Sequence, residues 1–117
     1  MQQERLIPGQ LDRDPTNSWQ QRVADFARCH RLLYDPVTHA LDLVSEVGEV
    51  AKEVLLATDY GRRAPQFRRR LADELGDALY SLLTLAEACG VNADGALNAA
   101  LEKYERRLGE RGKSGSE

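Results

Sequence analysis

The amino-acid sequence predicts an all-α fold: a four- to five-helix bundle-like domain built of antiparallel helices. The 117 residues include 31 Ala and Leu but 12 Val, Ile and Thr, and this bias favours helices over strands. The chain has four prolines, and no alternation of apolar and polar residues is long enough to predict a strand. A chain of this length is typical of one domain with one hydrophobic core.

We divide the chain into three parts. Residues 1–17 contain two prolines and Gly9 and are expected to form an irregular N-terminal arm. Residues 18–108 form the all-α domain. Residues 109–117 are polar and rich in Gly and Ser, and we expect a disordered tail.

Four helices are predicted within the domain. Apolar residues at helical spacing indicate the first, over about residues 18–33. Asp35 and Pro36 are a helix start signal for the second, which runs to about residue 57. The third covers about residues 66–89 and ends before Gly90, and Asn92 caps a fourth with a clean apolar stripe.

Composition limits the classes of function. The formal charge is −3 and the isoelectric point about 5.4, which argues against a nucleic-acid partner. No apolar stretch approaches the ~20 residues of a membrane span, and the N-terminus lacks a signal-peptide pattern. Cys29 and Cys89 stand far apart with no metal-binding spacing. These features predict a cytoplasmic protein without a membrane or a structural zinc.

An acidic ridge, defined as Asp42, Glu46, Glu49 and Glu53, follows one side of the second predicted helix. Apolar residues occupy the opposite side, so a solvated face is one interpretation. Solvated faces usually place Lys four residues from Glu, whereas every such partner on this ridge is another acid. The ridge therefore favours a bound cation.

The third predicted helix supplies two more carboxylates, Glu74 and Asp77. Two helices joined by a short loop pack antiparallel, so Glu46 and Glu49 can face this second pair across a groove. Four carboxylates without His or Cys suit hard cations such as Mg²⁺ or Mn²⁺. The Glu-x-x-His pattern of di-iron bundles and the calcium loop of EF-hands are both missing.

These residues also carry a family resemblance. Residues 43–53 (LVSEVGEVAKE) followed by residues 73–80 (DELGDALY) resemble the ExxE…ExxD signature of the MazG-like nucleoside triphosphate pyrophosphohydrolases. The segment from residue 101 to residue 107 (LEKYERR) is similar to the closing helix of that family. The resemblance covers roughly residues 19–108.

The resemblance implies an all-α protein that assembles as a homodimer or homotetramer through helix packing. It implies Mg²⁺-dependent cleavage of a nucleotide between its α and β phosphates, with Mn²⁺ as a substitute ion. Carried over, Glu46, Glu49, Glu74 and Asp77 are the metal ligands. Ser45 stands where many members have a further Glu, which leaves open how the attacking water is activated.

The other expected roles follow from the same resemblance and from the chemistry. Phosphoanhydride hydrolysis needs an in-line water and charge neutralisation. We expect a glutamate of the acidic ridge to accept the proton of the attacking water. The predicted catalytic residues are therefore Glu46, Glu49 and Glu53. The substrate-binding set consists of Lys103 and Arg107 on the phosphates, with Tyr104, Lys52 and Trp19 beside them.

Some residues allow two interpretations from sequence alone. Five arginines between the acidic motifs either pair with neighbouring acids or contact phosphate: Arg62, Arg63, Arg68, Arg69 and Arg70. Trp19 and Tyr60 are candidates to stack on a base, but the apolar stripe around Trp19 favours a core position for that residue.

Two alternative functions stay open. One keeps the fold and the chemistry but takes phosphoribosyl-ATP as the substrate. The other is a non-catalytic helical module that oligomerises and binds a partner. A binding module has no need of an uncompensated acidic groove, so the pyrophosphohydrolase is the first hypothesis.

Overall fold

The computed structural model describes residues 18–114, and the predicted arm at 1–17 and the last three tail residues lie outside this range. The described part consists of α2 (Trp19–Cys29), α3 (Pro36–Ala57), α4 (Arg69–Ala88) and α5 (Ala93–Ser114). It contains no strand. The predicted all-α class is confirmed.

The first described helix, α2, begins close to the predicted residue 18. The Ser18 side chain accepts a hydrogen bond from the Gln21 backbone N–H at 3.1 Å. The helix ends at Cys29, earlier than the predicted residue 33, because Arg31 adopts a left-handed backbone with φ 57°. The Leu32 N–H then closes the end on the Ala27 carbonyl at 2.7 Å.

Helix α3 has the predicted bounds. Asp35 accepts from the Thr38 N–H at 2.8 Å, and Pro36 occupies the first turn, where a missing N–H costs nothing. Buried His39 fixes the approach to the helix because its Nε2 accepts from the Tyr34 N–H at 2.8 Å.

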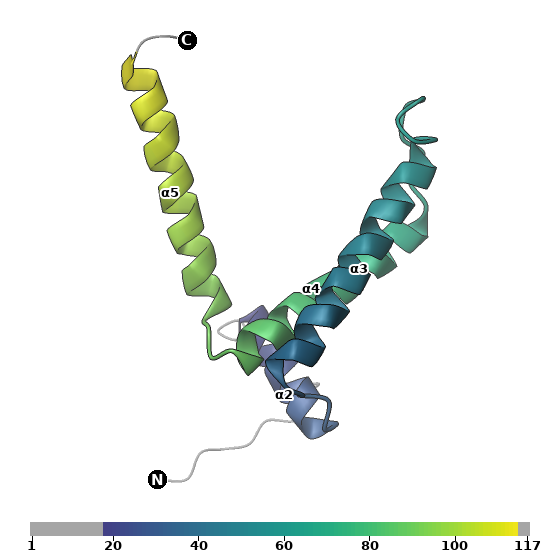
Figure 1. Cartoon of the computed structure of the whole chain (residues 1–117), viewed down its shortest axis with the longest axis vertical. Coiled ribbons are helices and arrows are strands. Elements are labelled where there is room, and N and C mark those ends of the chain that lie inside the picture. The colour runs from purple at the N-terminus through teal and green to yellow at the C-terminus, as the bar shows by residue number, and fades with distance from the viewer. Residues whose placement is uncertain (1–17, 115–117) are drawn as a thin grey trace.

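Helices α3 and α4 lie side by side, and α2 packs against α4 (Figure 1). Glu53 pairs with Arg68 near the connecting loop, and Glu46 lies with Asp77 further along, so the two helices run antiparallel as predicted. The predicted start of α4 at residue 66 is too early. The Gln66 N–H bonds to the carbonyl of Ala57, which keeps the loop extended up to Arg68.

Helix α5 stands away from the other helices (Figure 1). Gln20 holds its beginning, because its side-chain oxygen accepts from the Ala93 N–H at 2.7 Å and its amide nitrogen donates to the Val91 carbonyl at 2.8 Å. The radius of gyration is 18.4 Å, whereas a compact chain of this length has about 13 Å.

The prediction of a disordered tail from residue 109 is wrong as far as residue 114, because α5 continues to Ser114. Glu, Arg and Lys are good helix formers, and they offset the cost of about 1 kcal/mol for each of Gly109 and Gly112.

The interior of the helix assembly is small and polar. Among the described residues the buried apolar ones are Ala24, Ala27, Ala57 and Leu83, and the buried polar ones are His39, Glu53, Glu74, Ser81 and Thr84. Large apolar side chains face outward on every helix, including Val44 at 70% and Leu97 at 57% exposure. A single copy therefore leaves many large apolar side chains in contact with water.

Candidate metal and phosphate site

Three carboxylates predicted as metal ligands come together between α3 and α4. One oxygen each from Glu46, Glu74 and Asp77 lie within 4.8 Å of one another. Glu74 is buried, Glu46 is half-buried and Asp77 is exposed, so the group opens to solvent on the side of Asp77. We call these three residues the acidic cluster.

The cluster has the electrostatics of a cation site. Desolvation, and then the charges of Asp77, Glu74, Glu49 and Asp42, raise the pKa of Glu46 above its ordinary value of 4.5. Glu46 makes no hydrogen bond or ion pair with the residues at positions 18–114. A divalent cation relieves this repulsion, and an all-oxygen donor set fits Mg²⁺ or Mn²⁺.

Glu49 lies beside the acidic cluster but not in it. Its charge contributes to the raised pKa of Glu46, less than those of Asp77 and Glu74. Its side chain is exposed. The structure thus brings together three of the four predicted ligands and leaves the fourth on the open side of α3.

Glu53, the last residue of the acidic ridge, is paired with arginine. Both of its oxygens accept from Arg68, one from Nε and the other from Nη2, each at 2.9 Å. Glu53 is 4% exposed, and the hydrogen bond from Arg68 lowers its pKa despite the burial. The solvated-face interpretation of the ridge is therefore wrong at Glu53.

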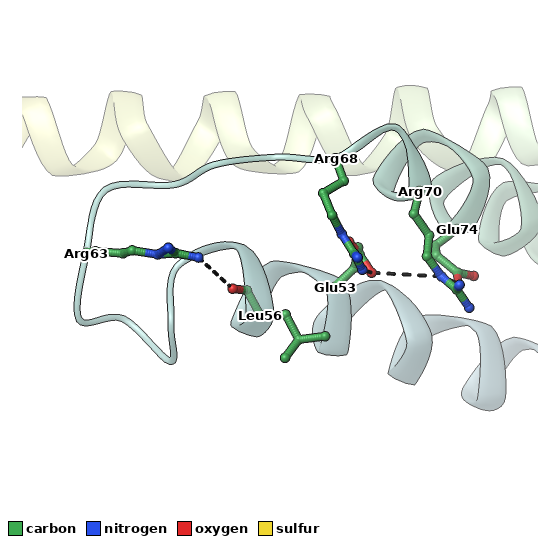
Figure 2. Close-up of polar contacts among 6 residues, drawn as sticks. All are labelled: Glu53, Leu56, Arg63, Arg68, Arg70 and Glu74. Atoms are coloured by element: carbon green, nitrogen blue, oxygen red, sulfur yellow. Dashed lines mark hydrogen bonds and ion pairs between the residues drawn. The ribbon is translucent and has the colours of Figure 1, made fainter.

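Arg70 connects this ion pair to the acidic cluster (Figure 2). Its Nε lies 3.3 Å from Glu74 Oε2 and 3.9 Å from Glu53 Oε2. The Arg70 side chain is 63% exposed, whereas that of Glu74 is 10% exposed. Arg70 is thus the cation that touches a residue of the acidic cluster, a role that the sequence did not single out among five arginines.

The other arginines of that group have different partners. Arg63 donates from Nη2 to the Leu56 carbonyl at 3.2 Å, which ties the loop to the end of α3 (Figure 2). Arg62 lies 3.6 Å from Asp59. Arg69 is exposed and has no hydrogen bond or ion pair with any residue that the structure describes.

The predicted substrate-binding residues of α5 are not near the acidic cluster in one copy. Lys103 lies over the ring of Tyr104, its Nζ 5.1 Å from the ring centroid. These residues and Arg107 lie on the part of α5 that extends away from α3 and α4 (Figure 1). A single chain does not combine the acidic and basic halves of the predicted site.

Trp19 is also apart from the acidic cluster. The expected core position of Trp19 is wrong for this chain, because Trp19 is 62% exposed. Its neighbour Gln20 contacts Glu87, which lies 13 residues beyond Glu74, about 20 Å along a helix. Lys52 is exposed on α3.

The fold and the site together define a class of protein: an all-α domain with a cluster of carboxylates on two antiparallel helices and arginines beside it. Comparison of the sequence with family models gives the particular family. Residues 35–111 match the MazG nucleotide pyrophosphohydrolase domain. The chain belongs to this family.

Individual relatives agree with this assignment. The chain is 35% identical over 83 residues to proteins described as nucleoside triphosphate pyrophosphohydrolase in Escherichia coli strains K12 and O157:H7. The match covers 71% of this chain and 30% of each relative. The chain therefore matches about a third of the length of these relatives.

A solved structure shares the fold. It is the Bacillus-conserved MazG protein, described as a nucleotide pyrophosphohydrolase, with a TM-score of 0.59 and 22% sequence identity. The similarity covers 87% of this chain and 93% of that one. Over the part of the chain that the structure describes, no helix is both long and apolar enough to span a membrane.

Proposed function

We propose that this protein hydrolyses a nucleoside or deoxynucleoside triphosphate between the α and β phosphates, releasing a monophosphate and pyrophosphate. The observation that carries the proposal is the acidic cluster, which places oxygens of Glu46, Glu74 and Asp77 within 4.8 Å of one another. Family membership supports a nucleotide as the substrate.

The residues of the cluster would hold Mg²⁺, or Mn²⁺ in its place, with Glu49 as a fourth ligand or as the base. The bound ion supplies charge neutralisation for the phosphates and a more acidic water. The hydrogen bond from Arg68 lowers the pKa of Glu53 and makes Glu53 a poor base, whereas Glu49 is exposed and has no arginine partner among the described residues. We therefore assign the base to Glu49 rather than to Glu53.

We also propose that the active form is a homodimer or homotetramer in which a second copy completes the site. Lys103 and Arg107 stand on α5, apart from the acidic cluster (Figure 1). The apolar stripe of the same helix is exposed, with Leu97, Leu101, Tyr104 and Leu108 at 50–62%. Burial of this stripe against the exposed apolar faces of α3 and α4 of another copy removes apolar surface from water.

A nucleotide panel tests the reaction. Purified protein is incubated with Mg²⁺ and each common ribo- and deoxyribonucleoside triphosphate, and with phosphoribosyl-ATP. Phosphorus NMR identifies the products. Pyrophosphate with a monophosphate supports the proposal, whereas orthophosphate contradicts the assigned bond. Cleavage of phosphoribosyl-ATP alone favours that alternative.

A thermal melt tests the non-catalytic alternative. A cation at 100 times its Kd stabilises the folded state by about 2.7 kcal/mol, so millimolar Mg²⁺ or Mn²⁺ should raise the Tm. If neither ion shifts the Tm and no nucleotide is hydrolysed, the helical module is favoured instead.

A mixing experiment tests the shared site. Glu74→Gln removes a cluster residue and Arg107→Ala removes a basic residue, and each variant alone should have little activity. If the two halves come from different copies, random mixing in a dimer should restore about a quarter of the wild-type rate, since half of the dimers carry one intact site out of two. If no activity returns after subunit exchange, each site is built within one copy.

A further inference from the structure

Arg70 lies beside the acidic cluster. Its Nε lies 3.3 Å from Glu74 Oε2, and Glu74 belongs to the three carboxylates that converge. The side chain is 63% exposed although its partner is buried. The guanidinium thus reaches from solvent into the edge of the cluster.

The hydrogen bonds of Arg70 leave most of its donors for another group. An arginine has five N–H donors arranged in a planar fork. Arg70 uses Nε on Glu74, and neither Nη1 nor Nη2 donates to any residue between positions 18 and 114. Such a fork matches the geometry of two phosphate oxygens.

Arg68 differs from Arg70 in how its N–H donors are used. Its Nε and Nη2 both bind Glu53, at 2.9 Å each, and this hydrogen bonding raises the pKa of Arg68 above its already high value. Arg68 and Glu53 therefore satisfy each other, and Arg68 acts as a structural clamp between the loop and α3. The Glu53 charge is largely neutralised by this pair, so Arg70 is not required to balance it.

We propose that Arg70 is a substrate-contacting residue that binds phosphate oxygens of the nucleotide, and that it serves as the counter-ion of Glu74 when no cation is bound. This inference rests on the proposed function. Glu46, Glu74 and Asp77 would hold the divalent cation, whose charge would weaken the attraction of Glu74 for Arg70. The Arg70 guanidinium would then be free to bind phosphate oxygens in place of the Glu74 carboxylate.

The two roles predict changes of opposite sign in Arg70→Gln. Removal of a positive charge next to the acidic cluster should strengthen Mn²⁺ binding in the nucleotide-free protein, by about two- to tenfold. Loss of a charge-assisted, forked contact should weaken the binding of inorganic pyrophosphate to the Mn²⁺-loaded protein by ~10-fold or more. A residue that only stabilises the fold moves neither value in this way.

The experiment is isothermal titration of Mn²⁺, and then of inorganic pyrophosphate, into wild type, Arg70→Gln and Arg70→Lys. Arg69→Gln is the matched control, since Arg69 precedes Arg70 and contacts no described residue through a hydrogen bond or an ion pair. Circular dichroism verifies that each variant is helical. Arg70→Lys should restore the wild-type Mn²⁺ affinity but only part of the pyrophosphate affinity, because an ammonium is a point charge.

Steady-state hydrolysis measured on the same samples separates the two proposals. If the wild type hydrolyses no nucleotide, the proposed function fails, and the pyrophosphate titration still decides the role of Arg70. If Arg70→Gln binds pyrophosphate as tightly as Arg69→Gln, or if the loaded wild type binds none, the inference about Arg70 is overturned whatever the activity.

Discussion

The helix pair α3–α4 and the single helix α5 use the same amphipathic pattern in different ways. In the pair, Glu53 and Glu74 are buried, whereas Val44 is exposed to water. Helix α5 has no such partner among the described helices; its apolar stripe and Arg107 are exposed, and Lys103 is half-buried. One region thus contains the acidic half of the proposed site, and the other holds the basic half.

This comparison indicates that the buried glutamates of the α3–α4 pair matter for both stability and function. Burial of two glutamates costs free energy unless they are paired or bind a cation. Glu53 is compensated by Arg68, whereas the acidic cluster has Arg70 at one edge and repulsion among its own members. The cluster is therefore the part of the pair that a bound metal changes most.

The largest expected effect is on the acidic cluster. Glu74→Gln keeps the size of the side chain but removes the charge of the buried ligand, so nucleotide hydrolysis should fall by at least ~10²-fold. The Mn²⁺ affinity of the nucleotide-free protein should fall as well. Kinetics and Mn²⁺ titration check both effects, with Asp94→Asn on α5 as the control. Wild-type rates in Glu74→Gln at saturating Mg²⁺ would falsify the metal assignment.

The second prediction concerns the apolar stripe of α5. Leu101 is 50% exposed in one copy, and burial of a leucine is worth about 1.5–3 kcal/mol. If the stripe packs against another copy, Leu101→Glu should dissociate the assembly. In a symmetric dimer the substitution occurs at two equivalent positions. Sedimentation velocity should show a smaller species, with Glu102→Ala as the control. If the wild type sediments as a monomer, the proposal that two copies share a site is wrong.

The third prediction tests the junction between the two regions. Gln20 bonds to Glu87, to the Val91 carbonyl and to the Ala93 N–H. Gln20→Ala should lower the free energy of unfolding by about 1–2 kcal/mol, since it leaves two backbone groups at the start of α5 without these partners. Urea unfolding measures the change. Gln21→Ala, which removes an exposed bond to Asp25, should have a smaller effect, and equal losses would contradict the role of Gln20.

The smallest expected effect depends on pH. The raised pKa of Glu46 means that the folded state holds this proton more tightly than the unfolded chain does. Protonated Glu46 therefore stabilises the folded state fully below pH 4.5. This stabilisation is lost as the pH rises through the pKa of Glu46 in the folded state. In EDTA, Glu46→Gln should therefore be more stable than wild type at pH 7, and the difference should vanish near pH 4.

Urea unfolding at the two pH values provides the test. A variant that is less stable than wild type at pH 7 would show that Glu46 is not under net repulsion in the empty cluster. Added Mn²⁺ should reverse the order at pH 7, because it stabilises the wild type and binds the variant more weakly.

Local signals predicted the helices well and their ends less well. Asp35 with Pro36 marked the start of α3 correctly, since capping depends on neighbouring residues alone. The start of α4 was predicted three residues too early, because the loop is held to α3 by the Gln66 N–H on the Ala57 carbonyl, a contact that no local pattern shows. Helix α5 continues past Gly109 and Gly112 to Ser114, because the good helix formers around the two glycines offset their cost.

The sequence by itself determined the all-α class, the antiparallel pairing of α3 with α4 and the residues of the acidic cluster. Helical periodicity decides which side chains share a face, so it placed Glu46 and Glu49 on one face and Glu74 and Asp77 on another, and the structure brings three of these four carboxylates together. Glu49 and Glu53 lie four residues apart on the acidic ridge. Only the tertiary structure decided which of them is paired with an arginine and which is exposed. The loop after α3 brings Arg68 back to Glu53 and leaves Glu49 exposed, because an ion pair between residues 15 positions apart depends on the path of the chain in space.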